Sequence, residues 1–533
     1  MFPLRYSPLA LVIFLVPVGL AVTLYHPIWG GLLTVLAMAL SALGLFDLTQ
    51  PHSSVLRNYP ISARLRFLLE TFRPEIRQYF VESDQDATPF SREQRALVYR
   101  RAKGIDGLRA FGTQLDVEKL GHEWLNHSMQ PAHLPSHDFR IKIGGEGCTK
   151  PYDSSVLNIS GMSYGALSPT AIEALNKGAA MGGFAHTTGE GSISRYHRAG
   201  GGDLVWQIAS GYFGCRNPDG SFSEEKFREN AGSDQVKMIE VKLSQGAKPG
   251  HGGILPGAKV TEAIAEARGV KLGEDCISPS THSAFSTPLE LCAFLQRLRE
   301  LSDGKPVGIK LCVGHPWEWF ALAKAFAQSG LSPDFITVDG AEGGTGAAPA
   351  EFADHFGAPL REGLMLVHNT LLGLGIRDRT KIIVSGKLVS AFDICRMFAL
   401  GADGCNMARG FMFAIGCIQA QACHSGKCPT GVTTQDPGRY RALVVNDKYQ
   451  RVAKFHANTM HALKEAVEAS GLQHPRDLTP HHLMIRVNSR EVRSAASQYL
   501  WLEPGGLLGG DVTHPAFAKY WDHAKAESFA FAM

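Results

Sequence analysis

Charged residues are scarce in this chain of 533 residues. They make up 19% of it, below the fraction of about 25% that is typical of soluble domains. Positive and negative charges nearly balance, with a formal net charge of +3 at pH 7. Proteins that bind nucleic acid normally carry a basic stripe or a basic domain, and only one short region here is rich in arginine. The composition therefore excludes nucleic acid as an expected partner and leaves room for a membrane segment.

The scarcity is greatest near the N-terminus, where the 41 residues from 6 to 46 include no Asp, Glu, Lys or Arg. Two apolar runs, Leu9–Tyr25 and Trp29–Phe46, fill most of this stretch. Each run is about long enough to cross the hydrocarbon core of a bilayer as a helix. We therefore expect residues 1–50 to form a transmembrane hairpin with helices at about 9–25 and 29–46.

The residues after the hairpin predict its orientation, because cytoplasmic loops carry an excess of Lys and Arg. Five arginines follow it: Arg57, Arg64, Arg66, Arg73 and Arg77. Both ends are therefore expected in the cytoplasm, which predicts an inner (cytoplasmic) membrane protein whose catalytic part is cytoplasmic. A cleaved signal peptide and a buried core hairpin stay open as alternatives, although a signal peptide needs only one apolar run. Residues 51–139 are interpreted as a helical, Arg-rich connecting region that packs on the catalytic part or lies along anionic lipid.

Short apolar runs alternate with amphipathic stretches after Phe139, as in parallel βαβ units. Eight runs are candidate strands: Val156–Ile159, Phe184–His186, Met238–Leu243, Cys276–Ser278, Val307–Val313, Phe335–Val338, Lys381–Val384 and Cys405–Ala408. Eight strands close a barrel. An open doubly wound sheet is the alternative, but no G-x-G-x-x-G turn follows the first strand. We therefore predict an α/β fold, a (β/α)8 TIM-type barrel with an N-terminal two-helix membrane anchor and helical additions.

Glycine and basic residues follow the last two candidate strands, as Gly386-Lys387 and Arg409-Gly410. Barrels commonly bind a phosphate at this place. Glycine lets the backbone approach the ligand closely, and a basic side chain offsets the phosphate charge. The pattern predicts a phosphorylated ligand or cofactor, of which flavin mononucleotide (FMN) is one candidate.

Three of the ten cysteines, Cys417, Cys423 and Cys428, stand in the spacing C-x5-C-x4-C. Structural disulfides are disfavoured in the cytoplasm, so clustered thiols indicate metal or redox ligands. Three thiolates suit an iron–sulfur cluster, and Pro429 matches the Cys-Pro ending of bacterial ferredoxin motifs. A tetrahedral zinc ion with His424 as the fourth ligand stays open as an alternative, and so does the absence of a metal.

Five motifs in this region resemble the synthase domain of glutamate synthases and occur in the family's order. They are Ser160-Gly161-Met162-Ser163-Tyr164-Gly165-Ala166-Leu167-Ser168, Thr188-Gly189-Glu190-Gly191, Gln245-Gly246-Ala247-Lys248-Pro249-Gly250, Gly343-Gly344-Thr345-Gly346-Ala347, and Cys417 to Cys428 with Pro429-Thr430-Gly431-Val432. The anchor, the region from Asn58 to Arg101 and Gly201–Gln207 resemble more narrowly the stand-alone, membrane-anchored, FMN-binding glutamate synthase-like proteins of bacteria.

The resemblance implies an FMN-binding barrel at 140–440, with an iron–sulfur segment at 417–428 and a helical cap and tail at 441–533. In that family, electrons pass through a 3Fe-4S cluster to FMN. The reduced flavin then delivers hydride to 2-iminoglutarate, formed from 2-oxoglutarate and ammonia, and glutamate results. The implied partners are 2-oxoglutarate, ammonia or a partner that supplies it, an external electron donor (a ferredoxin, a flavoprotein subunit or a membrane carrier) and the lipid bilayer.

The resemblance also assigns roles to residues. Lys310 and Glu190 are the expected catalytic residues, with Glu190 acting as a loop gate or only as a hydrogen-bond anchor. Gln245 and Lys248 are expected to bind substrate, although a surface loop would also account for Lys248. The expected cofactor-binding residues are Met162, Ser163, Lys310, Gly343, Gly344, Thr345, Gly386, Lys387, Gly404 and Arg409, and the expected cluster ligands are Cys417, Cys423 and Cys428.

Three departures from the family pattern bear on these expectations. We expect no N-terminal glutaminase, because the chain begins Met1-Phe2-Pro3 and continues into the anchor. We also expect no C-terminal β-helix domain, because about 100 residues follow Gln435. His251 stands where the family has an acidic residue. The alternative functions are a membrane-attached FMN/iron–sulfur electron-transfer component, and an FMN oxidoreductase acting on a different 2-oxo acid or amine.

Overall fold

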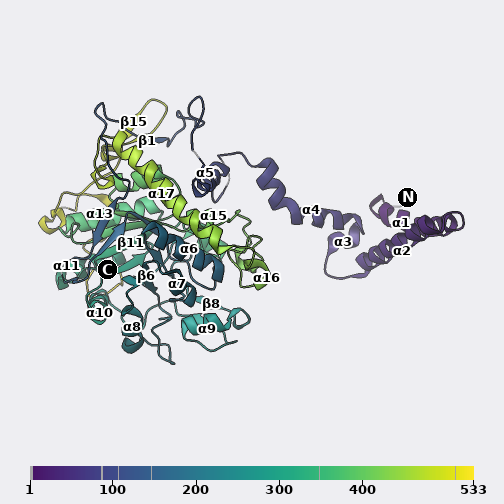
Figure 1. The fold of residues 1–533 in the computed structure, drawn as a ribbon, viewed down its shortest axis with the longest axis horizontal. Coiled ribbons are helices and arrows are strands. Elements are labelled where there is room, and N and C mark those ends of the chain that lie inside the picture. The colour runs from purple at the N-terminus through teal and green to yellow at the C-terminus, as the bar shows by residue number, and fades with distance from the viewer. Residues whose placement is uncertain are drawn as a thin grey trace. The chain divides into compact units, whose positions relative to one another are not determined.

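The computed structural model describes residues 4–85, 88–105, 107–145, 147–346, 348–510 and 512–532. Contacts between residues divide the chain into two compact units, Met1–Arg92 and Glu93–Met533. The first unit holds the two apolar helices, and the second holds the barrel (Figure 1). Each unit is described by itself.

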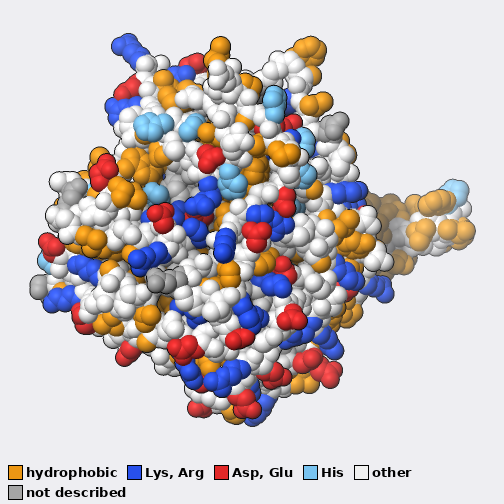
Figure 2. Space-filling view, turned by 60° about the vertical axis from the view of Figure 1, so that its left-hand side comes forward, with side chains coloured by type: hydrophobic (Ala, Val, Ile, Leu, Met, Phe, Trp, Pro, Cys, Tyr) orange, Lys and Arg blue, Asp and Glu red, His pale blue; other side chains and the backbone are white. Residues whose placement is uncertain are grey.

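A helical hairpin of α1 (Ser7–Thr23) and α2 (Pro27–Thr49) begins the first unit, after the short 3-10 helix η1 (Leu4–Tyr6). The apolar stretches Leu4–Thr23 and Pro27–Thr49 are each long enough to cross a membrane. The two predicted helices are therefore present, and apolar side chains cover much of the hairpin surface visible in Figure 2. The helices approach closely where they carry glycine: a side chain on Gly30 would collide with the backbone of Thr23.

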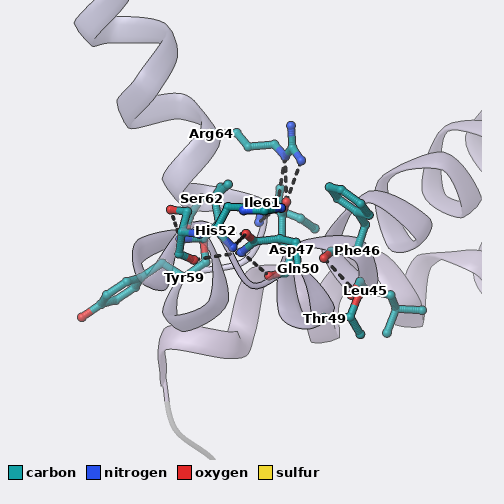
Figure 3. A network of polar contacts seen from close by, with 12 residues as sticks. Leu45, Phe46, Asp47, Thr49, Gln50, His52, Tyr59, Ile61, Ser62 and Arg64 are labelled. Carbon is teal, nitrogen blue, oxygen red and sulfur yellow. Dashed lines mark hydrogen bonds and ion pairs between the residues drawn. The ribbon is translucent and has the colours of Figure 1, made fainter.

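A buried carboxylate ends the hairpin and fixes the start of the next long helix. The side chain of Asp47 is fully buried. It accepts hydrogen bonds from the Ile61 backbone N–H at 3.1 Å and from Nη2 of Arg64 at 2.6 Å (Figure 3). The chain between Asp47 and Ile61 forms α3 (Ser54–Asn58). The helix α4 (Ser62–Ile76) follows and continues as the π-helical turn η2 (Arg77–Val81).

The second unit is built on a closed barrel of parallel strands, which confirms the predicted fold class. In barrel order the strands are β4 (Leu157–Ile159), β5 (His186–Thr187), β6 (Leu204–Ile208), β7 (Val236–Lys242), β10 (Val307–Leu311), β11 (Phe335–Asp339), β12 (Lys381–Ser385) and β13 (Gly404–Met407). The helices that connect them are α6 (Pro169–Gly182), α7 (Arg195–Gly200), α8 (Glu224–Ala231), α10 (Pro288–Leu301), α11 (Pro316–Ser329), α13 (Leu360–Gly373) and α14 (Ala391–Ala399).

One predicted strand does not belong to the barrel. Cys276–Ser278 forms β9, which pairs antiparallel with β8 (Gly253–Leu255) in an excursion between β7 and β10. Its place in the barrel is taken by β6, which the sequence analysis missed as a strand. The reason is that α7, the helix before β6, has only six residues and gives no clear helical pattern between two strands.

Additions surround this barrel. They comprise α5 (Arg92–Lys103), β1 (Glu123–Leu125), β2 (Arg140–Ile143), β3 (Tyr152–Ser155), η3 (Gly257–Lys259), α9 (Glu262–Arg268), α12 (Ala350–His355), α15 (Arg409–Ala414), η4 (Cys423–Ser425), α16 (Pro437–Tyr440), α17 (Val445–Ala469), η5 (Pro475–Asp477), β14 (Leu483–Arg486), β15 (Val492–Ser494), α18 (Ala495–Gln498), η6 (Gly506–Gly509) and α19 (Pro515–Tyr520). β1, β14 and β15 form a small antiparallel sheet.

A buried ion pair closes the amino-terminal end of the barrel. Asp334, directly before β11, lies 3.0 Å from Nη2 of Arg299 and accepts a hydrogen bond from the Val307 N–H at 2.8 Å. Charge at this end of a barrel serves stability, whereas functional groups come from the carboxyl ends of the strands. The opposite end is therefore the place to look for a site.

Candidate active site

Two neighbouring barrel strands present charged side chains to the interior near their carboxyl ends. β7 carries Glu240 and Lys242, and β10 carries Lys310. All three side chains are buried, and the strand register sets Lys242 opposite Lys310. Buried charges are costly unless they are paired. The partners of these residues therefore define the site.

The Nζ atom of Lys242 joins two residues that the sequence analysis singled out. It lies 2.7 Å from Oε2 of Glu190 and 2.8 Å from Oε1 of Gln245. The next residue in the chain, Gly246, donates its backbone N–H to Oδ2 of Asp339 at 3.0 Å. That same oxygen lies 3.4 Å from Nζ of Lys310. One polar network thus runs from Glu190 to Lys310 across the mouth of the barrel.

The charges in this network hold one another ionised. The positive charge of Lys242 lowers the pKa of Glu190 to about 2, so Glu190 is a carboxylate throughout the neutral range. Burial by itself lowers the pKa of Lys310, but the negative charges of Asp339, Glu240 and Glu190 together outweigh burial, and the pKa is raised. Burial lowers the pKa of Lys242, and the attraction of Glu190 opposes that shift. Lys310 is therefore a cation fixed at the strand end.

Glu240 anchors a second set of contacts deeper in the barrel. Its carboxylate accepts hydrogen bonds from Nε2 of Gln207 and from Oγ1 of Thr337, each at 2.5 Å. The held Gln207 side chain lies against Gly161, where a Cβ atom would stand only 2.9 Å from Nε2 of Gln207. The backbone after β4 therefore approaches the interior network as closely as only glycine allows.

The loop that holds Met162 and Ser163 lies beside the loop that holds Glu190. A Cβ atom on Gly189 would stand 2.5 Å from the backbone nitrogen of Ser163. A Cβ atom on Gly191 would stand 3.2 Å from Cβ of Ser163. The structure thus brings together two motifs that are separate in the sequence.

A pocket opens above this network, and three predicted residues line it: Glu190, Gln245 and Lys248. Lys242 lines it too, and so do His251 and Ser278 from the excursion between β7 and β10. A pocket with two lysines, an amide and a carboxylate suits an anionic ligand that also carries a hydrogen-bond donor. The pocket position of Lys248 favours a binding role over that of an ordinary surface lysine.

His251 lies at the edge of this pocket. Its Nδ1 atom is 2.6 Å from the carbonyl oxygen of Gly252, and its ring meets the ring of Phe352 edge-on. The residue that departs from the family pattern is therefore a pocket residue and not a remote one.

Three of the four expected phosphate-binding residues, Gly386, Lys387 and Arg409, follow the last two strands of the barrel, as predicted. Gly386 and Lys387 come after β12, and Lys387 has a φ of +48°. Arg409 begins α15, after β13. Gly404 is placed differently from the other three, because it begins β13 and lies at the amino end of that strand, beside Ile141 and Val156. A Cβ atom on Gly386 would stand 3.5 Å from the carboxyl carbon of Glu342, in the loop after β11.

The loop after β11 holds the remaining expected cofactor residues, Gly343, Gly344 and Thr345. A Cβ atom on Gly344 would meet nothing within 4 Å, so open space lies beside this backbone. Ala347, the last residue of the same motif, lies outside the described residues.

Cys417, Cys423 and Cys428 line one cavity, together with Arg409. Cys417 and Cys428 are buried, and Cys423 is partly exposed. Burial by itself raises the pKa of Cys428, but hydrogen bonds from Thr433 and Thr430 outweigh burial and lower it to about 7. Burial raises the pKa of Cys417, which the positive charge of Arg409 opposes. The thiols share a cavity in which at least one is readily ionised.

No group of three His, Cys, Asp or Glu side chains among the described residues is arranged to hold a metal ion. This finding applies equally to His424 and to the three cysteines. An iron–sulfur cluster takes one thiolate on each ligated iron, which spreads the thiolates over several metal atoms. Three cysteines around one cavity are compatible with that arrangement.

The segment from Cys417 to Gln435, here called the cysteine segment, packs on the mouth of the barrel. A Cβ atom on Gly346 would stand 4.0 Å from Cβ of Cys423. The N–H of Ser168 donates to the carbonyl oxygen of Val432 at 2.9 Å, and Nε2 of Gln435 donates to the carbonyl oxygen of Leu167 at 2.8 Å. The segment is thus held against the loops after β4 and β11, beside the expected cofactor residues.

Sequence reasoning missed Lys242, Glu240 and Asp339. A signal was available for the first two, since a charged residue in an apolar barrel strand must be paired or functional. The same argument identified Lys310 as a candidate, and it applies equally to Glu240 and Lys242 in β7. Asp339 ends β11 before Gly340, and only the folded barrel shows that it faces Lys310.

Comparison with known proteins agrees with this arrangement. Residues 141–473 match the family model described as the conserved region in glutamate synthase. A glutamate synthase large subunit-like protein, YerD, of Bacillus subtilis (strain 168) is 38% identical over 481 residues, which covers 83% of this chain and 91% of that protein. A protein with the same description from Rhizobium meliloti (strain 1021) is 31% identical over 405 residues, covering 72% of this chain and 88% of that protein.

An archaeal-type glutamate synthase [NADPH] of Thermotoga neapolitana is 35% identical over 312 residues, and the match covers 58% of each chain. The family model covers more than half of this chain, and YerD matches most of its length. The chain therefore belongs to the glutamate synthase family, whose members are oxidoreductases acting on CH–NH2 donors.

Proposed function

We propose that this protein is an FMN-dependent glutamate synthase-like enzyme that reduces 2-iminoglutarate, formed from 2-oxoglutarate and ammonia, to glutamate. Electrons arrive from an external donor, such as a ferredoxin, a flavoprotein subunit or a membrane carrier, by way of a 3Fe-4S cluster. The observation that carries the proposal is the pocket of Lys242, Lys248, Gln245 and Glu190, which lies at the same barrel mouth as the cysteine segment.

The substrate is a dianion, and the pocket offers two lysines for its two carboxylates. Lys242 is neutralised by Glu190 in this structure, at 2.7 Å, so an entering carboxylate competes with Glu190 for that ammonium group. Gln245, whose oxygen is engaged by Lys242, has an amide N–H2 group to offer to a carboxylate. Glu190, ionised at neutral pH, is then available to attract the cationic iminium group of the intermediate.

The residues at the barrel mouth fit FMN. Asn406, near the carboxyl end of β13, has a buried side-chain oxygen that finds no hydrogen-bond partner among the described residues. Gly344 borders open space. We assign the phosphate to Gly386, Lys387 and Arg409, and the ring to Met162, Ser163, Gly343, Thr345 and Lys310. Bound FMN supplies the hydride, and Lys310 contributes a fixed positive charge at that mouth that offsets the negative charge of a reduced ring.

Cys417, Cys423 and Cys428 are proposed as the cluster ligands. The backbone of the first is held by Tyr99, whose hydroxyl donates to the carbonyl oxygen of Cys417 at 2.7 Å. The short route from Cys423 to the loop of Gly346 supports electron delivery toward the flavin site. Cys423→Ser is expected to lower the iron and sulfide content of the purified protein, and stoichiometric zinc without iron would contradict the cluster.

We further propose that α1 and α2 anchor the enzyme in the inner membrane with the catalytic unit in the cytoplasm. Only 17% and 22% of the residues in the two apolar windows are buried, whereas a helix in a protein core is mostly buried. The exposed side chains include Leu11, Phe14, Leu32, Leu36 and Phe46. The five arginines after the hairpin favour a cytoplasmic location for both of its ends.

The reaction is tested with the full-length protein, purified without oxygen and reduced chemically. Addition of 2-oxoglutarate with ammonium is expected to reoxidise the flavin and to yield glutamate in equal amount. Either compound alone serves as the control. Failure of every 2-oxo acid tried with ammonium to reoxidise the flavin would contradict the proposal and favour an electron-transfer component. Reoxidation by a different 2-oxo acid only would identify another substrate.

A further inference from the structure

The helix α4 carries an apolar stripe that faces outward. Leu65, Leu68, Leu69, Phe72 and Ile76 recur at the spacing i, i+3, i+4, i+7 and i+11, which aligns them on one face of a helix. Each of these side chains is between 43% and 60% exposed. The turn η2 extends the apolar surface with exposed Tyr79, Phe80 and Val81. A continuous exposed apolar surface of this kind marks an interaction site.

Arginines run along one side of this stripe. Arg66, Arg73 and Arg77 are spaced by seven and four residues, so they share a side of the helix, and Arg73 lies one turn from both Leu69 and Ile76. Residues 51–81 include five arginines and only two glutamates. Arg66 is paired with Glu70 at 2.9 Å, but both side chains stay largely exposed. The segment therefore combines an apolar stripe with a positively charged flank.

The junction with the hairpin fixes where this helix starts. Ile61 has a φ of +67°, which is unfavourable for a β-branched residue, and its N–H is held by the buried carboxylate of Asp47. The same carboxylate binds Arg64, in the first turn of α4. From this junction α4 leads away from the hairpin (Figures 1 and 3). The strained backbone of Ile61 and the buried charge of Asp47 therefore lie where the chain leaves the apolar hairpin.

We propose that α4 and η2 lie on the cytoplasmic face of the membrane that holds the hairpin. The apolar stripe enters the boundary between headgroups and acyl chains, and the arginines contact anionic headgroups. Charge and continuity favour a lipid occupant, because α4 is the first long helix after the apolar hairpin and the flank of its stripe is positive. This inference rests on the proposed membrane anchor.

The test uses the full-length protein in nanodiscs that contain phosphatidylglycerol and phosphatidylethanolamine. A photoreactive benzoylphenylalanine replaces Phe72, on the stripe, or Thr71, on another face of the same turn, as the matched control. A third variant carries it at Leu36, an exposed position of α2. After irradiation, mass spectrometry identifies what each position has captured.

We expect lipid adducts at Leu36 and at Phe72, with a several-fold lower yield at Thr71. We also expect the yield at Phe72, but not at Leu36, to fall when Arg66 and Arg73 are changed to Gln or when phosphatidylcholine replaces the anionic lipid. Lipid capture at Leu36 without lipid capture at Phe72 overturns the inference and leaves the anchor intact. Capture of the catalytic unit or of a second copy by Phe72 overturns it as well. No lipid at Leu36 contradicts the anchor itself.

Discussion

The contact between Lys242 and Glu190 sets the charge state of the proposed substrate pocket. Lys242 is the main cause of the lowered pKa of Glu190, about 2 against an ordinary value of 4.5. A carboxylate with a lowered pKa stabilises the folded protein above its ordinary pKa, and that contribution is lost as the pH falls through the lowered value. The pair therefore contributes fully above about pH 4.5 and is lost only toward pH 2.

This arrangement predicts the behaviour of Lys242→Met. Loss of the ammonium removes a carboxylate-binding group, so KM for 2-oxoglutarate should rise about tenfold or more, which corresponds to ~1.4 kcal/mol or more. The pKa of Glu190 should rise toward 4.5, and the acid limb of kcat/KM should move up with it. Both are read from steady-state kinetics as a function of pH.

Lys271→Met is the matched control, since Lys271 is 82% exposed and lies outside the pocket. It should change neither KM nor the acid limb. If Lys242→Met left both values at those of the parent enzyme, Lys242 would have no part in substrate binding.

Single residues show what the sequence could predict about the site. Glu190, Gln245 and Lys248 were predicted from motifs, and the fold brings all three to one pocket. Lys242 was missed although a charged residue in an apolar strand gave a signal, whereas Asp339 was missed because its partner, Lys310, belongs to another strand. Which strands become neighbours is decided when the barrel closes, and local sequence does not record it.

At the scale of elements, apolar runs before glycine or polar clusters predicted most of the barrel strands. The error fell on β6, which follows a helix of only six residues, and on Cys276–Ser278, which lies in an excursion. Both segments are short and apolar. Hydrophobic pattern alone does not distinguish a barrel strand from a strand in an insertion, because both can be short apolar runs.

The hairpin offers a prediction at the same scale. A side chain on Gly30 would collide with the backbone of Thr23, whereas one on its neighbour Gly31 would meet nothing within 4 Å. Gly30→Leu should therefore separate α1 from α2 and destabilise the hairpin by ~1–3 kcal/mol, the usual range for overpacking. Gly31→Leu should be nearly neutral.

The two variants are compared by unfolding of the detergent-solubilised full-length protein, followed through the fluorescence of Trp29 after the other tryptophans have been replaced. An equal effect of both substitutions would show that the helices do not pack through Gly30.

At the scale of the whole molecule, the pocket, the cysteine cavity and the conserved region all lie in the second unit. Deletion of residues 1–90 should therefore release the protein from the membrane fraction. The shortened protein should keep its flavin and iron, and should still reduce a 2-oxo acid with ammonium when a chemical reductant replaces the natural donor. Absorbance spectra, iron analysis and glutamate assay measure these properties. Loss of flavin from an otherwise folded shortened protein would contradict the division into two units.

The excursion between β7 and β10 contributes to the pocket separately from the cofactor-binding loops. It supplies His251 and Ser278 to the pocket, while the cysteine segment and the glycine loops after β11 and β12 belong to other parts of the chain. Under the proposed function, we expect mutations in β8, β9 and their connections to change which 2-oxo acid binds and to leave the proposed route of the electrons unchanged. Under the same proposal, His251 is a position where substitution would change the substrate and leave the cofactor-binding loops unaltered.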